Sequence, residues 1–210
     1  MSVLTDIAEL VQKGKEQEVS DLVAQALDEG LEAQQILDEG LLKGMGELGV
    51  KFKNNEVFVP EVLIAARALN KGTETLKAKL VDVDIKAIGK VVLATVAGDL
   101  HDIGKNLVKL MLEGAGFEVV DLGTDVPPDK IVEAVNEHNP DVLALSALLT
   151  TTMAAQGETI KALEAAGIRD KVKVIVGGAP ITEAFAKEIG ADGYSEDASG
   201  AADTAKSFLN

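Results

Sequence analysis

The chain has 210 residues, of which 47% are hydrophobic, it has no cysteine, and its formal net charge at neutral pH is −15. An acidic surface repels phosphate backbones and anionic lipids, which argues against nucleic-acid and membrane partners. The lack of cysteine excludes disulfides, thiolate metal ligands and cysteine nucleophiles. Charges interrupt the N-terminal segment every few residues, so we expect neither a signal peptide nor a membrane span there and predict a soluble cytoplasmic protein.

The first 80 residues show helical periodicity only, without an alternating β-branched run. Pro60 suits the first turn of a helix. We therefore predict a helical domain over residues 1–80, followed by a linker over residues 81–89, which contains few strong helix formers. The predicted helices cover approximately residues 2–12, 16–28, 32–52 and 59–80.

From Lys90 onward, short apolar runs alternate with helical stretches. This alternation predicts a parallel sheet covered by helices on both faces, and residues 90–210 form an α/β domain in this interpretation. Five strands match a flavodoxin-like (Rossmann-type) domain, whose ligands bind beyond the carboxyl ends of the strands near the topological switch point. The predicted strands are Val91–Ala97, Glu118–Asp121, Val142–Ser146, Val172–Val176 and a short one near Gly193, with helices near 102–115, 128–138, 151–166, 182–189 and 197–208.

A histidine follows the first predicted strand, in the segment "AGDLHDIG". His101 stands between Asp99 and Asp102, at the edge of the sheet where ligands bind. Asp102 suits the N-cap of the next helix, and Asp99 is better placed to accept the second ring N–H. Such a carboxylate fixes the tautomer and makes the other ring nitrogen more basic, as in metal-ligating imidazoles. The alternative is a surface histidine beside a helix cap.

Two further signals follow later strands. The third strand ends in "ALSALLTTTMAAQ", which places the hydroxyls of Ser146, Thr150, Thr151 and Thr152 at the same edge of the sheet. Ordinary loop and N-cap chemistry is the alternative. The fourth strand ends in "VIVGGAP", where the pair Gly177-Gly178 either forms a plain turn or lets the backbone lie against a flat group, because glycine has no Cβ.

Together these signals form one spaced pattern: Asp99-x-His101-x-x-Gly104, then 41 residues, Ser146-x-Leu148, then 28 residues, and the glycine pair. The pattern resembles the cobalamin-binding domain of methionine synthase and of the small corrinoid proteins of methyltransferase systems. The segment "NNEVFVPEVLIAARAL" is similar to the last helix of the helical cap in that family. The resemblance covers nearly the whole chain and implies a four-helix-bundle cap before the sheet domain. In size and layout it points to the corrinoid proteins of methylamine, methanol, quaternary-amine and aryl-methyl-ether demethylation.

The resemblance implies a cobamide cofactor (cobalamin or a related corrinoid) that alternates between methyl-Co(III) and Co(I). It would bind base-off/His-on, with its own base displaced from cobalt and its nucleotide tail in a slot of the sheet domain. His101 would be the lower cobalt ligand, Asp99 its hydrogen-bond partner, and Thr152 the third member of the relay, where methionine synthase has serine. The other implied cofactor contacts are Ser146, Leu148 and Thr150 along the slot, Gly177 and Gly178 at the buried base, Asp102 and Gly104 below the corrin ring, Tyr194 at the far end of the slot, and Phe58 as the capping residue above the methyl group.

The resemblance implies a methyl carrier and not a complete enzyme, because the chain contains no segment the size of a TIM barrel to activate a methyl donor. A substrate-specific methyltransferase would methylate Co(I), and an acceptor methyltransferase would pass the methyl group to a folate or thiol. A corrinoid reductive activase is a third expected partner. The linker over residues 81–89 would be the hinge that lets the cap move aside.

Three alternatives remain. A cobalamin-dependent mutase subunit carries the same histidine motif but usually lacks a helical cap. A cobalamin-sensing regulator can have the cap, but the nine basic and 14 acidic side chains of residues 1–80 supply no basic recognition helix. A flavodoxin-like nucleotide or phosphoacceptor domain would need no cobalamin. A receiver domain, however, needs an aspartate where Ser146 stands, and the loop after the first strand lacks G-x-G-x-x-G. The second histidine, His138, is expected to be exposed at a helix end.

Overall fold

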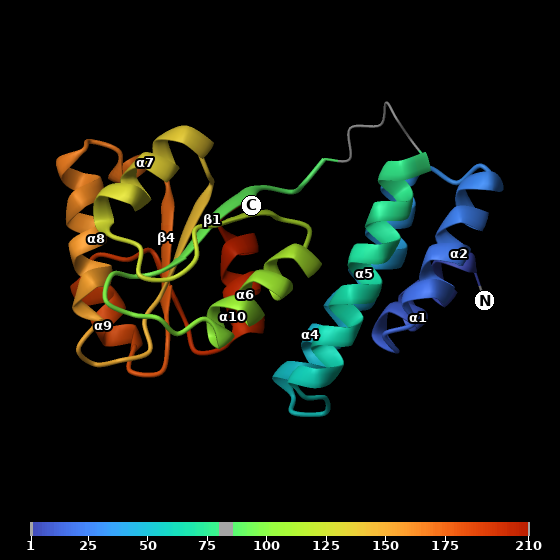
Figure 1. The fold of residues 1–210 in the computed structure, drawn as a ribbon, viewed down its shortest axis with the longest axis horizontal. Coiled ribbons are helices and arrows are strands. Elements are labelled where there is room, and N and C mark those ends of the chain that lie inside the picture. Colours follow the sequence, from blue (N-terminus) through green and yellow to red (C-terminus); the bar gives the residue numbers. More distant parts are fainter. Residues whose placement is uncertain (1, 80–85, 210) are drawn as a thin grey trace. The chain divides into compact units, whose positions relative to one another are not determined.

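The structure is a computed structural model that describes residues 2–79 and 86–209. It divides into two compact units: one contains helices α1 to α5, and the other contains the sheet with helices α6 to α10 (Figure 1). Most of the predicted linker, residues 81–85, lies outside the described residues. Within the described ranges, no helix is long and apolar enough to cross a membrane.

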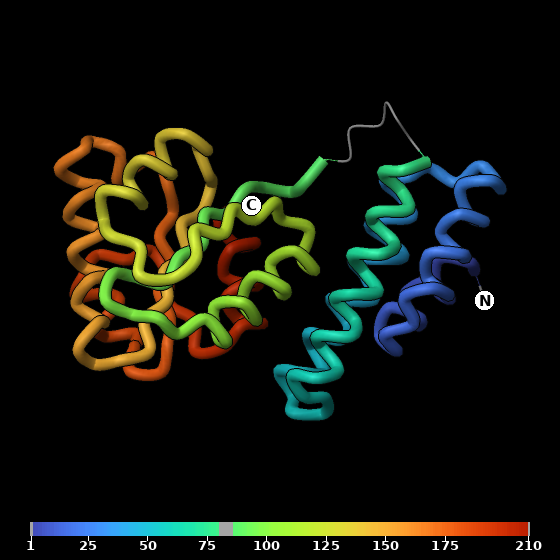
Figure 2. The backbone as a smooth tube through the Cα atoms, viewed as in Figure 1, coloured from blue at the N-terminus to red at the C-terminus, as the bar shows by residue number. Residues whose placement is uncertain are grey.

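The helical unit contains α1, α2 and α5, and a further helical run lies between α2 and α5 in the chain (Figure 2). Ser2 caps α1 by accepting a hydrogen bond from the Thr5 main-chain N–H. Gly44 lets α4 lie close to α1, because a Cβ at this position would stand 2.6 Å from the Ala8 carbonyl oxygen. The bounds are α1 Val3–Gln12, α2 Glu16–Asp28, α3 Ala33–Gln35, η1 Ile36–Leu42, α4 Lys43–Lys53 and α5 Val59–Lys79.

The third predicted helix, residues 32–52, is helical but not regular. Its middle, η1, is a π-helical segment, so the run is divided into α3, η1 and α4. A π-helical segment adds a residue to the turn, which the spacing of apolar residues does not reveal. The other three helices of this unit agree with the prediction to within one residue where the structure describes their ends.

The second unit contains a five-stranded, all-parallel sheet with the strand order β2-β1-β3-β4-β5. This order confirms the flavodoxin-like fold, and it places the topological switch point between β1 and β3. The strands are β1 Lys90–Thr95, β2 Glu118–Asp121, β3 Val142–Ser146, β4 Lys173–Gly177 and β5 Gly193–Ser195. Strand β4 begins and ends one residue later than predicted, and β1 ends at Thr95, after which Val96 forms a single bridge to Val126.

Helices cover both faces of this sheet (Figure 1). One face packs against α7, α8 and α9 through a large apolar cluster, and the other carries α6 and α10. Helix α8 begins at Ala154 and not at residue 151, because Leu149 to Met153 form a separate turn. The bounds are α6 Ile103–Gly114, α7 Pro128–His138, α8 Ala154–Ala165, the 3₁₀ turn η2 Arg169–Lys171, α9 Glu183–Glu188 and α10 Ala198–Ser207.

The sheet face on the side of α6 and α10 ends in a row of small residues. Strand residues that pack into the apolar cluster, such as Leu145 and Val176, point to the α7–α9 side, so their neighbours point the other way. The pairing register then aligns four such neighbours across the carboxyl edge. We call them the small-residue row: Thr95, Ser146, Gly177 and Ser195. No bulky side chain of the strands occupies this edge.

Candidate functional site

The loop after β1 holds a short contact between a histidine and a buried carboxylate. Asp99 is fully buried, and its Oδ1 lies 2.7 Å from Nδ1 of His101 and 3.1 Å from the main-chain N of His101. A carboxylate that accepts two hydrogen bonds here requires Nδ1 to carry the proton. The other ring nitrogen, Nε2, then keeps its electron pair, and the side chain of His101 is 50% exposed.

The second carboxylate oxygen of Asp99 is held by the loop after β3. Thr152 donates its hydroxyl to Oδ2 at 2.6 Å, the main-chain N–H of Leu148 donates at 2.7 Å, and that of Leu149 at 3.4 Å. The turn that delays the start of α8 brings these donors to Asp99. The structure therefore brings His101, Asp99 and Thr152 together in one chain of hydrogen bonds, and their cofactor roles stay a prediction.

Electrostatics favour an ionised Asp99. Burial raises the pKa of its carboxyl group, but hydrogen bonds from Thr152, Leu148 and His101 outweigh burial and hold the pKa well below its usual value. Asp99 is therefore a charged acceptor at neutral pH. It fixes the tautomer of His101 and leaves Nε2 free to act as a metal ligand.

A metal bound to this imidazole must bring its own additional ligands. Among the described residues, no group of three or more histidine, aspartate or glutamate side chains could hold a metal ion. The two loops that form this site and the first turn of α6 expose large apolar side chains instead: Leu100 is 73% and Ile103 81% exposed, and Leu148 and Leu149 are also exposed. A single imidazole with apolar surroundings fits a metal inside a broad organic ring.

The small-residue row and the two glycines fit the tail of such a group. A Cβ on Gly177 would lie 2.9 Å from the Ser195 carbonyl oxygen. Gly178 has φ +126°, and a Cβ there would overlap the Ala147 carbonyl. The protein's own backbone thus requires both glycines, in addition to any contact with a ligand. The row also lacks bulky side chains, and its members Ser146 and Gly177 are only half buried, which fits a flat, elongated group at this edge.

The remaining predicted cofactor contacts belong to both units: three lie in the sheet unit and one in the helical unit. Gly104 is exposed in the first turn of α6, with no atom within 4 Å of an ideal Cβ. Asp102 accepts hydrogen bonds from Asn106 at its side chain and at its carbonyl. Thr150 is exposed in the β3–α8 loop. Phe58 belongs to the helical unit, where it is 63% exposed just before α5 and donates its main-chain N–H to Glu61.

The position of Tyr194 corrects one prediction. Its side chain packs against the apolar cluster on the α7–α9 side, paired in register with Val176, so it does not lie on the face of the small-residue row. The next residue, Ser195, takes that place, because successive strand residues point to opposite faces. Sequence reasoning assigned the aromatic side chain to the slot and missed the serine beside it.

Sequence reasoning also missed two buried polar residues. Thr95 donates its hydroxyl to the His101 carbonyl oxygen at 2.9 Å, which anchors the histidine from below. Gln156 in α8 is fully buried, and its Nε2 donates to the carbonyls of Leu145 and Gly177 at 3.0 and 3.1 Å. Its Oε1 has no partner among the described residues. A polar residue within the apolar run "VVLATV" was the one sequence signal for Thr95.

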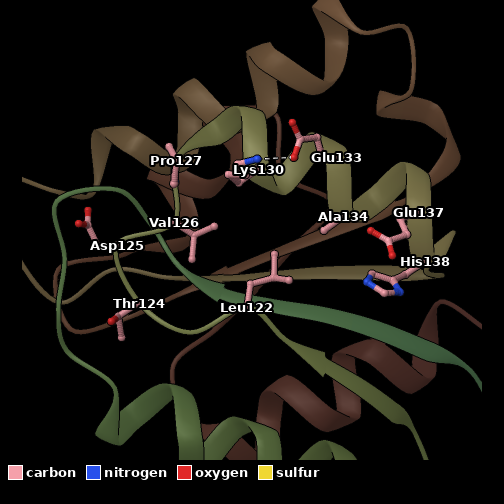
Figure 3. A pocket seen from close by; sticks show the side chains of 10 residues that line it. All are labelled: Leu122, Thr124, Asp125, Val126, Pro127, Lys130, Glu133, Ala134, Glu137 and His138. Carbon is pink, nitrogen blue, oxygen red and sulfur yellow. Dashed lines mark hydrogen bonds and ion pairs between the residues drawn. The ribbon is translucent and has the colours of Figure 1, made fainter.

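A separate hollow of about 420 Å³ lies between α7 and the loop that follows β2 (Figure 3). Leu122 and Val126 come from the loop, and Ala134, Glu137 and His138 come from α7. Lys130 at its wall is paired with Glu133 at 2.7 Å. His101 does not line this hollow, so it is distinct from the edge of the sheet described above.

A flavodoxin-like domain with a carboxylate-supported imidazole at its switch point, beside an edge of small residues, defines a cobamide-binding domain. Comparison with known proteins agrees. Residues 89–203 match the family model of the B12 binding domain, and residues 3–77 match a second model with the same description. The chain belongs to this B12-binding family, as a corrinoid protein, and its cofactor is a cobamide with cobalt at its centre.

Curated relatives and solved structures cover nearly the whole chain. It is 43% identical to dimethylamine corrinoid protein 1 of Methanosarcina mazei, over 98% of this chain and 99% of that protein. Identity to the trimethylamine corrinoid protein of Methanosarcina barkeri is also 43%, over 96% and 97%. The methanol:cobalamin methyltransferase complex of Methanosarcina barkeri matches with a TM-score of 0.90 at 33% identity, over 99% of this chain and 79% of that one. A cobalamin-binding protein of Desulfitobacterium hafniense DCB-2 matches with a TM-score of 0.81 at 35% identity, over 99% and 98%.

Proposed function

We propose that the chain is a methyl carrier that binds its cobamide base-off/His-on, with Nε2 of His101 as the lower ligand of cobalt. The observation that carries this proposal is the pairing of a buried, ionised Asp99 with a half-exposed imidazole. When bound, the cobamide supplies a cobalt that accepts a methyl group as Co(I) and carries it as methyl-Co(III).

The residues of the chain supply position and proton control. Asp99 holds the proton on Nδ1 of His101, so Nε2 faces outward with its electron pair free to bind. Thr152 and Leu148 hold that carboxylate in place by donating hydrogen bonds to Oδ2. These groups thereby keep the imidazole in one orientation for ligation.

The nucleotide tail would lie along the small-residue row. The half-buried Ser146 and Gly177 and the exposed Leu148 present small or flexible surfaces at the edge of the sheet, whereas Ser195 is buried. Exposed apolar residues at the start of α5 (Phe58, Val59, Leu63 and Ile64) support the role of the helical unit as a cap over the methyl-bearing face.

The carrier role requires partners, which we propose to be a substrate-specific methyltransferase, an acceptor methyltransferase with a folate or thiol substrate, and a reductive activase. The names of the relatives support methylated amines as the methyl source, and one solved relative is a methyltransferase complex. These partners also imply a cytoplasmic location. No specific observation on the described residues favours a mutase subunit or a regulator.

The test is reconstitution of the full chain with cobalamin. We expect the bound cob(II)alamin to show an electron paramagnetic resonance spectrum with an axial nitrogen, and labelling the protein with [¹⁵N]histidine to convert the triplet splitting to a doublet. Dimethylamine alone should produce no methylated cobalt, and a partner methyltransferase should restore methylation. Methylation without any second protein would overturn the carrier role, and an unlabelled axial nitrogen would overturn ligation by His101.

A further inference from the structure

The loop of Asp99 and His101 is held on its second side by the loop that follows β2. At the last residue of β1, the Thr95 N–H donates to the Gly123 carbonyl at 3.0 Å, and the Val126 N–H donates to the Thr95 carbonyl at 3.1 Å. Val96 and Val126 form a parallel bridge. The β2–α7 loop therefore runs alongside the first residues of the motif loop and continues the sheet past its last regular strand pair.

Asp125 makes the two contacts of this loop that lie nearest to the motif. Its main-chain N–H donates to the Asp99 carbonyl oxygen at 2.9 Å, and its carboxylate Oδ1 accepts from the Gly98 N–H at 2.7 Å. One residue thus holds the peptide groups on both sides of the Gly98–Asp99 bond. None of these contacts is local, since Asp125 lies 27 residues after Gly98.

The backbone at both positions suits this clamp. Gly98 has φ +78° and Asp125 has φ +54°, which is the left-handed region. Glycine adopts that conformation freely, and aspartate and asparagine adopt it more readily than most residues. The identity of residue 125 therefore satisfies two demands together: a left-handed backbone and a side-chain acceptor directed at Gly98.

We propose that Asp125 is a positioning residue for the axial ligand: it fixes the main chain of Gly98 and Asp99, and through them the direction of the His101 imidazole. This inference rests on the proposed ligation of cobalt by His101. The β3–α8 loop holds the carboxylate of Asp99 through Thr152, but it leaves the main chain of Asp99 to be held from elsewhere. A ligand group must be held within about 0.5 Å of its productive position, so loosening this clamp weakens ligation without removing a ligand.

Replacing Asp125 by asparagine or by glycine separates its charge from its acceptor oxygen, because both residues tolerate the left-handed backbone. Asp125→Asn keeps both the left-handed preference and an acceptor oxygen, and it removes only the charge. Asp125→Gly keeps the backbone conformation and removes the acceptor. Asp125→Ala also removes the acceptor but strains the left-handed backbone, so it should weaken ligation at least as much as Asp125→Gly. The matched control is Asp129→Asn, which neutralises an exposed aspartate in the first turn of α7.

The experiment measures axial ligation and loop protection in the full chain. With cob(II)alamin bound, the ratio of histidine-ligated to unligated cobalt is read from the [¹⁵N]histidine splitting. In the cobamide-free protein, amide hydrogen exchange of Gly98 is measured alongside the unfolding midpoint. Loss of one hydrogen bond to an exposed acceptor should lower the ligation ratio of Asp125→Gly about fivefold and speed Gly98 exchange by a similar factor. Asp125→Asn and Asp129→Asn should stay within about twofold of the parent chain.

The outcomes separate the two hypotheses. A parent chain that shows no histidine splitting contradicts the proposed function itself. A parent chain that is ligated, with Asp125→Gly or Asp125→Ala ligated equally well, overturns the role of Asp125 alone. A ratio that falls as far in Asp125→Asn as in Asp125→Gly also overturns it, because charge and not the acceptor would then be responsible.

Discussion

Two aspartates near the ends of neighbouring strands have different partners: the buried Asp99 after β1 and the partly buried Asp121 at the end of β2. Asp121 accepts from the buried ammonium of Lys105 at 2.6 Å through both of its oxygens, and from the Gly123 N–H at 3.0 Å. Asp99 accepts from uncharged donors and from an imidazole that is half exposed. The pKa of each carboxyl group is lowered despite burial, so both are ionised.

The difference separates a structural pair from a functional one. The charge of Asp121 is balanced inside the protein by Lys105, which is itself 3% exposed, and by Lys109 at 3.7 Å. The charge of Asp99 is stabilised by hydrogen bonds without a buried cation, and it acts on a ring whose second nitrogen faces outward. Burial and a low pKa alone therefore do not identify the site; the exposure of the partner does.

The largest expected change follows from breaking the structural pair. Asp121→Asn leaves the ammonium of Lys105 buried without its counter-charge, and such losses cost about 3–5 kcal/mol of unfolding free energy. Urea denaturation measures this cost. Adding Lys105→Met in the same chain should recover part of it, since both buried charges are then gone. A loss below about 1 kcal/mol in the single variant would show that Lys105 finds other partners.

Asp99→Asn should lower the free energy of unfolding less than Asp121→Asn does, and it should weaken cobalamin binding more. Both carboxylate oxygens accept hydrogen bonds, so the amide NH₂ of asparagine faces a donor, and an unsatisfied buried group costs about 1–3 kcal/mol. The imidazole loses its support, and replacing such a partner of a metal ligand typically costs about 10- to 100-fold in affinity. Urea denaturation and cobalamin titration measure the two effects. Equal cobalamin affinity in the variant and the parent chain contradicts the proposed role of Asp99.

Acid should remove the stabilisation that the ionised carboxylate of Asp99 gives to the folded chain. A carboxyl group whose pKa is lower in the folded than in the unfolded state stabilises the fold above its unfolded pKa, here 3.8, and this contribution is lost as the pH falls toward the folded value. The stability difference between the parent chain and Asp99→Asn should therefore shrink below about pH 4. Urea denaturation at pH 7, 5 and 3 measures it, with Asp129→Asn as the control. A difference independent of pH would show that Asp99 is not ionised in the folded state.

The contrast between these aspartates also shows what sequence alone could predict. Asp99 and His101 are two residues apart, so local reasoning placed them together, whereas the role of Thr152 came from a family resemblance. Lys105 and Asp121 lie 16 residues apart, and only the packing of α6 beside β2 joins them.

The fold shows the same division. The order and type of the elements followed from periodicity, because core-facing positions repeat along each helix and strand. Periodicity did not predict three features: the π-helical segment η1, the late start of α8 and the last residue of β4. Backbone contacts across the chain decide them. The orientation of Tyr194 was missed because a three-residue strand gives too short a pattern to fix which face each residue occupies.

A smaller effect is expected from Thr152→Val, which keeps the shape of the side chain and removes the hydroxyl that donates to Asp99. One hydrogen bond is lost, so we expect about 1 kcal/mol of destabilisation. Thr152→Ser restores the donor and should remain close to the parent chain. Thr150→Val is the matched control on an exposed threonine of the same loop, expected within about 0.5 kcal/mol. Equal losses at positions 150 and 152, measured by urea denaturation, would contradict a specific contact with Asp99.

His101→Ala should change stability least, by about 0.5 kcal/mol or less, because half of the imidazole is exposed and Asp99 keeps its contacts with Thr152 and Leu148. Its effect on the cofactor should nevertheless be complete: the nitrogen splitting from labelled histidine disappears from bound cob(II)alamin. His138→Ala removes the only other histidine of the chain and should leave the splitting intact. Asp121→Asn should lower stability strongly and leave ligation of the folded fraction unchanged. His101→Ala and Asp121→Asn should therefore have opposite effects. A nitrogen splitting that survives in His101→Ala would contradict this expectation and assign the cobalt ligand to another residue.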